Sequence, residues 1–380
     1  DRALRHEDAT AEDLAAMAKI VEESMTAGAV GFSTSRTVGH RSVVGETIPG
    51  TFAEREELLA LAGAMKAANK GVFQAVPAGV VGDLAGPEHQ TTEEEVALFA
   101  DIAEASGRAV TFTLAQNFNR PDQWRHCLDI VEQASDRGLI IMPQIATRPI
   151  GFVTSLKSYH MFQRRRTYLE LVDLPFAERL AMLKRPDIKA RILADDDIQP
   201  ELAGSMENIY GLLGMAASSM FPLSVPMNYE PEPEGTLGHL AEKAGMPIDS
   251  FVYDFLLGEE GNNFAISLGA NFVSGNFDVI HDMLLHPQTT IGLSDAGAHV
   301  NLIFDAVGPT YQLMHWVRDR SRGPKLPIEL IVAKQTARNA DLFGLKDRGR
   351  IAPGQIADLN VLDLDRLSLG ELRVTHDLPA

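Results

Sequence analysis

Residues 91–114, TTEEEVALFADIAEASGRAVTFTL, decide the fold class of this chain. Val96, Phe99 and Ile102 recur at helical spacing after a polar start, which predicts an amphipathic helix. Gly107 marks the end of that helix, because glycine readily adopts the left-handed conformation of a C-terminal cap. The apolar run 110–114 then predicts a short buried strand. A helix, a glycine and a strand therefore form one unit.

The same unit recurs elsewhere in the first 150 residues. Helices are predicted to start near Thr10, Thr51 and Pro121, and they lead into strands at 29–33, 72–76 and 139–142. Further strands are predicted at 265–268, 271–273 and 290–294. Helices that alternate with short apolar strands indicate a parallel sheet covered by helices. The predicted fold class is therefore α/β, and specifically a (β/α)8 TIM-type barrel.

The strand count suggests that this barrel is incomplete in the chain. The sequence offers about six parallel strands, whereas a closed barrel takes eight. An open doubly wound sheet would accept six, but its G-x-G-x-x-G dinucleotide motif is absent. The chain begins at Asp1 without a methionine, so we expect the missing strands upstream.

Composition excludes several classes of function. The net charge of −18 disfavours binding to nucleic acid or to an anionic membrane surface. No apolar run of about 18 residues is present, so no spanning helix is expected. The single cysteine, Cys127, excludes a disulfide scaffold and predicts a reducing, cytoplasmic location. A homo-oligomer stays possible.

Two regions depart from the repeating unit. Residues 1–345 are predicted to form the barrel of a hydrolase, with an elaborated loop or lid at about 150–262, where the rhythm breaks and prolines gather at 222–233. Residues 346–380 are predicted to supply the C-terminal strands of a small β-sandwich, because 357–362 alternate as a strand does.

Asp295 is the most informative candidate for catalysis. It follows the apolar strand predicted at 290–294 and precedes a turn of small residues. In a barrel, this end of a strand lies at the active-site rim. A carboxylate there can ligate a cation and can accept a proton from metal-bound water. The alternative is that Asp295 forms an Asx turn or caps a helix.

Other polar residues near strand ends are candidates for substrate binding. Gln116 follows the third strand, Gln144 and Arg148 follow the fourth, and Arg36 follows the first. His299 lies four residues beyond Asp295. The two arginines could grip a substrate carboxylate in bidentate fashion, or they could form internal ion pairs with acidic residues. No H-x-H or H-E-x-x-H occurs, so the other histidines, His315 among them, are interpreted as structural or solvated.

Three stretches resemble one family. Gly292-Leu293-Ser294-Asp295 resembles the last-strand Ser-Asp-Gly motif of the D-aminoacylase branch of the amidohydrolase superfamily, the N-acyl-D-amino-acid deacylases. Residues 345–359, LKDRGRIAPGQIADL, are similar to the segment by which the family returns to its β-sandwich, and residues 28–34, GAVGFST, to its third-strand segment.

The resemblance implies a metal-dependent barrel that hydrolyses the amide bond of a small molecule. It implies one divalent metal, zinc, with Asp295 as both a metal ligand and the general base. Members of the family also carry an H-x-H and a cysteine ligand, and both would precede Asp1 here. The 380-residue chain alone is therefore expected not to hydrolyse amides.

The sequence departs from the family pattern at two metal ligands. The positions of two ligating histidines are occupied by Val76 and Leu114, whose side chains cannot bind zinc. A site built from those two ligands is expected to be absent or rebuilt. Three hypotheses follow: a divergent amidohydrolase, a metal-free barrel that acts as a structural or regulatory partner, and a metal-free lyase that uses Asp295 alone as its base.

Overall fold

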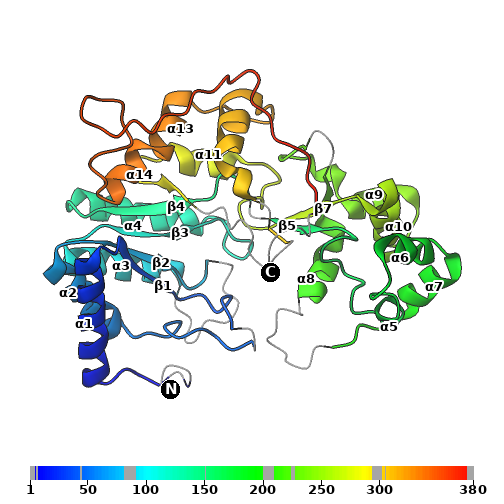
Figure 1. The fold of residues 1–380 in the computed structure, drawn as a ribbon, viewed down its shortest axis with the longest axis horizontal. Coiled ribbons are helices and arrows are strands. Elements are labelled where there is room, and N and C mark those ends of the chain that lie inside the picture. Colours follow the sequence, from blue (N-terminus) through cyan, green and yellow to red (C-terminus); the bar gives the residue numbers. More distant parts are fainter. Residues whose placement is uncertain are drawn as a thin grey trace.

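The computed structural model describes residues 5, 7–42, 45–80, 91–149, 151–199, 209–223, 227–292, 302–303 and 305–374. Its main sheet has five parallel strands in the order β1-β2-β3-β4-β8 (Figure 1). The strands are β1 (Gly31–Ser35), β2 (Val72–Val76), β3 (Val110–Leu114), β4 (Ile141–Ile145) and β8 (Thr290–Ile291). Parallel pairing places the carboxyl ends of all five strands at the same edge of the sheet.

Four helices accompany the first four strands and pack on one another in sequence order: α1 precedes β1, and the other three lie between successive strands. They are α1 (Ala11–Ala27), α2 (Arg55–Ala68), α3 (Thr92–Ser106) and α4 (Gln123–Asp136). Helices α1 and α3 begin with capping boxes, in which Thr10 pairs with Asp13 and Thr91 pairs with Glu94. Gly107 ends α3 in the left-handed conformation, as predicted. Because strands and helices both follow sequence order, this half has the arrangement of a barrel wall.

The prediction of an α/β fold with a parallel sheet is confirmed. Strands β1, β2 and β3 lie within two residues of their predicted positions, and the fourth begins at Ile141 instead of 139. The sheet is not closed among the described residues, because β1 and β8 are its two edges. The described part is therefore an open segment that is consistent with a TIM-type barrel.

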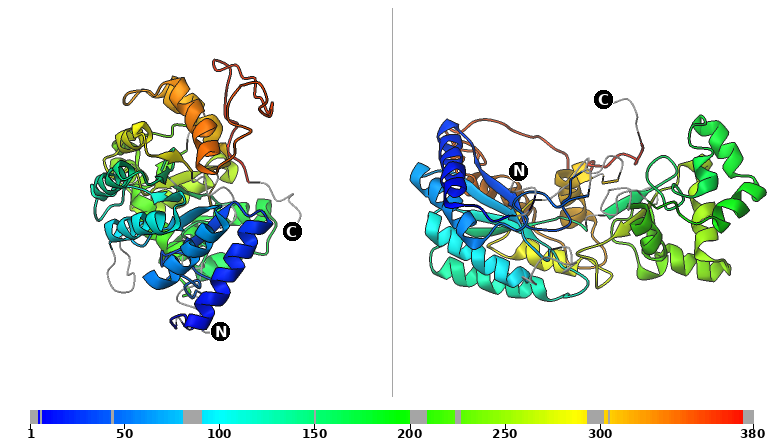
Figure 2. Two further views of the ribbon diagram at one scale, coloured as in Figure 1. Left: turned by 90° about the vertical axis from the view of Figure 1, so that its left-hand side faces the viewer. Right: turned by 90° about the horizontal axis from the view of Figure 1, so that it is seen from below.

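A second group of elements covers residues 151–268. Strands β5 (Gly151–Thr154), β7 (Ala265–Leu268) and β6 (Phe221–Pro222) form a small antiparallel sheet. Its helices lie on the opposite side of the molecule from α1 and α2 (Figure 2) and surround their own apolar cluster. They are α5 (Arg166–Leu169), α6 (Phe176–Leu183), α7 (Pro186–Ala194), α8 (Ile209–Ala216), α9 (Leu237–Ala244) and α10 (Ile248–Gly261).

Three sequence-based predictions differ from this structure. The strand at 265–268 was expected in the parallel sheet, but it pairs antiparallel with β5. The first residue of β5, Gly151, lies opposite Leu268, and its last residue, Thr154, lies opposite Ala265. Residues 271–273 form a turn instead of a strand, because Asn271 adopts a left-handed φ of 71°. Residues 357–362 make no strand pairing and are exposed, so their alternating pattern finds no partner strand in the described structure.

The remaining helices cover the sheet next to β4 and β8. They are α11 (Asp278–Leu285), α12 (Gly308–Tyr311), the π-helix η7 (Gln312–Asp319), α13 (Ile328–Gln335) and α14 (Ala337–Leu342). Trp316 of η7 is fully buried, and its indole nitrogen donates a hydrogen bond to the carbonyl of Thr147, 2.7 Å away. None of the described helices is both long and apolar enough to cross a membrane.

Candidate functional site

The carboxyl edge of the parallel sheet is the first candidate site. Asp295 and His299, which were predicted there, lie outside the described residues. Gly292 follows β8 and is described, and it lies against Gln144 of the neighbouring strand. A methyl group placed on Gly292 would come within 2.7 Å of Gln144 Cβ. The chain therefore enters the segment that contains Asp295 directly beside the Gln144 side chain.

Arg36 follows β1 and is part of a buried ion pair. Its Nε donates to Glu95 Oε2 over 2.6 Å, and its Nη1 donates to the carbonyl of Ala53 over 2.7 Å. The Glu95 side chain is fully buried and that of Arg36 nearly so. This is the internal ion pair that the sequence left open as the alternative to substrate binding. Arg36 therefore ties the end of β1 to α3.

Gln116 links the end of β3 to the turn at 271–273. Its backbone nitrogen donates to Asn271 Oδ1 over 2.7 Å, and its side-chain oxygen accepts from the nitrogen of Val273 over 3.3 Å. Its side-chain nitrogen donates to the carbonyl of Pro121 over 3.2 Å. The Gln116 side chain is buried, and both its amide oxygen and its amide nitrogen are hydrogen-bonded. Gln116 therefore joins neighbouring segments at the carboxyl edge of the sheet.

Arg148 follows β4 and lies between two tyrosines. Its guanidinium carbon is 5.0 Å from the ring centroid of Tyr229 and 5.9 Å from that of Tyr311. Burial lowers the pKa of Arg148, while the two phenols act in the opposite direction. Cation–π contacts of this kind stabilise a buried guanidinium by up to about 2 kcal/mol. The structure thus connects the end of β4 to residues 229 and 311.

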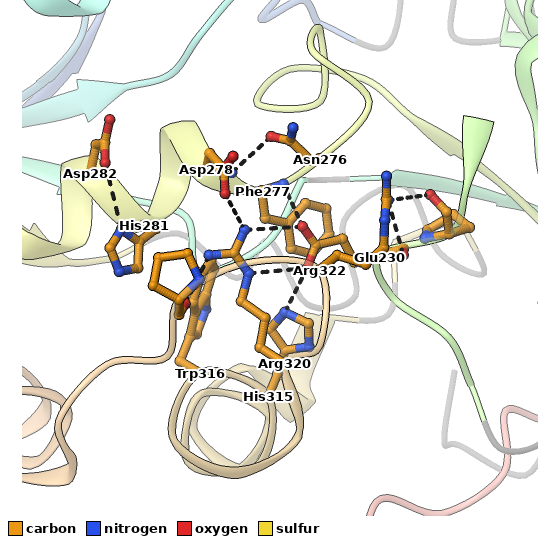
Figure 3. Close-up of polar contacts among 12 residues, drawn as sticks. Glu230, Asn276, Phe277, Asp278, His281, Asp282, His315, Trp316, Arg320 and Arg322 are labelled. Atoms are coloured by element: carbon orange, nitrogen blue, oxygen red, sulfur yellow. Dashed lines mark hydrogen bonds and ion pairs between the residues drawn. The ribbon is translucent and has the colours of Figure 1, made fainter.

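Beyond Tyr229 lies a buried ionic network that the sequence analysis missed (Figure 3). Glu230 accepts hydrogen bonds from Arg320, at 3.1 Å and 3.2 Å, and from the backbone nitrogen of Phe277, at 2.7 Å. Arg320 also donates to Asp278 over 2.6 Å. Burial alone would raise the pKa of Glu230, but the neighbouring His315 and Arg320 side chains and the backbone N–H of Phe277 hold it at about 2. The carboxylate is therefore ionised at neutral pH.

His315 connects this network to a cavity. Its Nε2 lies 3.4 Å from Glu230 Oε2, and its ring stacks on Tyr311 with centroids 5.0 Å apart and planes 13° apart. The ring lines a cavity of about 160 Å³ together with Tyr229, Glu230, Tyr311, Asp319 and Arg322. The cavity is thus bordered by an imidazole whose Nε2 faces a carboxylate oxygen.

The structure brings some predicted residues together and leaves others apart. Arg148 lies beside the two tyrosines of the cavity, and Gln144 lies beside Gly292. Arg36 and Gln116 are engaged in internal contacts. No local pattern marks Glu230, because its partners are 47 to 90 residues away along the chain. His315 was interpreted as structural or solvated because no H-x-H or H-E-x-x-H motif includes it.

The described residues do not supply a zinc site. No group of three His, Cys, Asp or Glu side chains that could hold a metal ion is found among them. Val76 ends β2 and Leu114 ends β3, and Leu114 is buried among apolar side chains. Hydrocarbon side chains cannot replace the imidazole ligands of zinc. The two positions therefore do not fit the metal site that the resemblance implied.

The model of a family described as "Amidohydrolase family" matches residues 1–378 of this chain. No curated protein and no solved structure gives a significant match.

Proposed function

Because the chain belongs to the amidohydrolase family, we propose that it hydrolyses the C–N bond of a small amide, in the manner of N-acyl-D-amino-acid deacylases. The match over residues 1–378 is the observation that carries this proposal. The parallel sheet supports it, since the carboxyl edge of such a sheet is where barrel enzymes place their active sites. The family supports a hydrolase in general, and the amide substrate is our proposal.

Asp295 is the proposed proton acceptor. Water attacks the carbonyl carbon of the amide and gives one proton to the Asp295 carboxylate. The C–N bond then breaks, the acyl group leaves as a carboxylic acid, and the nitrogen takes up a proton to leave as an amine. Gln144 and Arg148 are proposed to contact the substrate, because one lies beside Gly292 and the other follows the adjacent strand β4. His299 stays a predicted contact.

One observation favours a second candidate, a barrel without catalysis that acts as a structural or regulatory partner. Val76 and Leu114 occupy two ligand positions of the family. A protein that had lost its chemistry would show such substitutions. The prediction of one zinc per chain, held partly by Asp295, therefore needs a direct metal analysis. The buried, unpaired thiol of Cys127 supports the proposed cytoplasmic location.

The test uses the full-length protein. Release of free amine is measured on a panel of N-acetyl D- and L-amino acids, and bound metal is measured by elemental analysis. We expect hydrolysis of at least one compound and a loss of about 10³-fold or more in Asp295→Asn. The matched control is Asp365→Asn, which changes an exposed carboxylate of the C-terminal segment and should leave the rate unchanged. Hydrolysis of no compound, or full activity in Asp295→Asn, would contradict the proposal.

A further inference from the structure

The cavity beside His315 has no part in the proposed function. Its walls come from residues 227–230, the helices α12 and η7, residues 321–322 and Leu369 of the C-terminal segment. Its volume of about 160 Å³ is close to the roughly 150 Å³ of an apolar cavity that binds benzene. Asn228, Asp319 and Ser321 of its wall are exposed, so the cavity is open to solvent. The cavity therefore has the size and the access for one small ring.

The cavity wall is rich in rings and thioethers. The ring of His315 stacks on that of Tyr311, and the ring of Tyr229 meets Tyr311 edge-on with centroids 4.9 Å apart. Met227 and Met314 also line the cavity. Met314 and His315 lie on the π-helix η7, a rare form that is enriched at functional sites. Because aromatic rings and thioether sulfurs both make favourable contacts with other rings, a flat aromatic ring fits this wall better than a saturated ring of the same size.

The charges around the cavity favour a neutral ligand. Each aspartate, glutamate and arginine of its wall forms an ion pair with another side chain of the protein. The pairs are Glu230 with Arg320, Asp319 with Arg318, and Arg322 with Glu232. Arg148 also lies 5.0 Å from the ring centroid of Tyr229, so a second cation on these rings would be repelled. A charged ligand would therefore gain less in this cavity than a neutral one.

Tyr311 supplies a hydroxyl group that the protein leaves unsatisfied. Its side chain is 1% exposed and lines the cavity, and the hydroxyl has no hydrogen-bond partner among the described residues. Burial raises the pKa of Tyr311 well above its usual range, so the hydroxyl keeps its proton at neutral pH. A buried hydroxyl without a partner costs free energy, which a hydrogen bond from a ligand would recover. A ligand with its own hydroxyl group can form that bond.

Leu369 forms the part of the cavity wall that comes from the C-terminal segment. Arg318 of η7 donates to the carbonyl of Leu364 and, over 3.0 Å, to that of Leu367. These bonds hold the segment against η7, and Leu369 packs against the main apolar cluster. A larger side chain at position 369 would therefore occupy space in the cavity.

We propose that this cavity binds a small neutral phenol, whose ring packs among the aromatic side chains and methionines and whose hydroxyl pairs with that of Tyr311. A phenol combines one six-membered aromatic ring, one hydroxyl group and no charge at neutral pH. The inference concerns binding alone and does not depend on the proposed function.

The first experiment measures the class of ligand that binds. The full-length protein is added to 4-fluorophenol, and the width of the fluorine NMR line reports the bound fraction. We expect the line to broaden and unlabelled phenol to reverse the broadening. Cyclohexanol, which has the hydroxyl but no aromatic ring, should need a concentration about tenfold higher. No broadening, or equal competition by phenol and cyclohexanol, would overturn the inference.

The second experiment locates the site. Leu369→Trp fills the cavity and should abolish the broadening, while its melting temperature shows that the variant is folded. Leu359→Trp is the matched control, because Leu359 lies in the same C-terminal segment, is 61% exposed and lies outside the cavity wall. This control should bind 4-fluorophenol as the wild type does. Unchanged binding in Leu369→Trp would show that the phenol binds elsewhere and would contradict the inference.

The third experiment tests the hydrogen bond and stays decisive if Leu369→Trp does not fold. Tyr311→Phe keeps the ring and removes only the hydroxyl, so the affinity for 4-fluorophenol should fall by up to about tenfold. The affinity for fluorobenzene, which has no hydroxyl, should not fall. Tyr253→Phe is the matched control, because it removes a buried hydroxyl that donates to the carbonyl of Leu183, away from the cavity. An affinity for 4-fluorophenol that is the same in Tyr311→Phe and Tyr253→Phe would refute the proposed pairing with Tyr311.

Discussion

Two buried ion pairs lie in different parts of the molecule, and only the first was among the alternatives that the sequence suggested. Arg36 and Glu95 join β1 to α3 within the repeating part of the chain, where the sequence pattern predicts the alternation of helix and strand. Glu230 and Arg320 join two irregular segments 90 residues apart. The first pair joins a strand to a helix, whereas the second lies beside the His315 imidazole at a cavity. Burial of charge is therefore common to both, and access to a ligand distinguishes them.

The largest expected effect comes from breaking each pair. Removal of one partner of a buried ion pair leaves the other charge buried without compensation, which costs about 3–5 kcal/mol. Glu95→Ala and Glu230→Ala should each lower the free energy of unfolding by that amount in urea denaturation. Glu232→Ala is the control, because Glu232 is two-thirds exposed and its pair with Arg322 should contribute under about 1 kcal/mol. Equal losses of unfolding free energy in all three variants would show that the buried ion pairs contribute no more to stability than the exposed one.

Lys334 gives the next effect, which depends on pH. Its fully buried ammonium group donates to Thr289 Oγ1, to the carbonyl of Thr289 and to that of His286, and no carboxylate faces it among the described residues. Burial lowers the pKa of Lys334 to about 7 from 10.5. Between these two values the unfolded chain binds the extra proton, so the contribution of Lys334 to stability rises with pH by up to about 1.4 kcal/mol per pH unit.

Urea unfolding at pH 7, 8 and 9 tests this, with Lys334→Met as the variant. The slope of stability against pH should be lower in Lys334→Met than in the wild type. A slope that is the same in both proteins would show that the buried ammonium does not titrate in this window.

A smaller effect is expected at Gly292, where β8 leads into the segment that contains Asp295. Gly292→Ala places a methyl group against Gln144 and should cost about 1–3 kcal/mol, as overpacked positions do. Gly63→Ala is the matched control, because its methyl group would meet nothing within 4 Å in the middle of α2. That control should be neutral or stabilise by up to about 1 kcal/mol. The melting temperatures of both variants measure these effects. A Gly292→Ala variant as stable as Gly63→Ala would contradict the close contact between Gly292 and Gln144.

The smallest effect concerns the capping box that opens α3. Thr91 accepts from the backbone nitrogen of Glu94, so Thr91→Ala should cost about 1 kcal/mol. Thr26→Ala is a suitable control, because the Thr26 hydroxyl bonds a carbonyl of its own exposed helix. A loss at Thr91 no larger than at Thr26 would show that the cap does not stabilise the repeating half.

The fold was predictable where local patterns determine structure. The periodicity of Val96, Phe99 and Ile102 and the stop at Gly107 act within one unit, and both are present in the structure. The parallel or antiparallel choice for residues 265–268 was not predictable, because it depends on pairing with β5 more than 100 residues earlier. A short apolar run indicates a buried strand but does not indicate which strand it pairs with.

The candidate site was predictable to a smaller degree. Strand ends indicated where polar residues meet, and Arg148 lies there, but the same rule also selected Arg36, whose partner Glu95 is contributed by a distant helix. Glu230 and His315 form a pair only through the fold, because a single acid and a single histidine 85 residues apart carry no pattern. Predicting that pair requires tertiary structure.

The position of Trp316 has a practical consequence. The chain has two tryptophans, and Trp316 is buried with its ring 5.1 Å from that of His315, while Trp124 lies on α4 beneath Arg125. Trp124→Phe would leave Trp316 as the only indole, whose emission can be excited apart from that of the six tyrosines. Its fluorescence would then follow occupancy of the neighbouring cavity in real time and without an added dye.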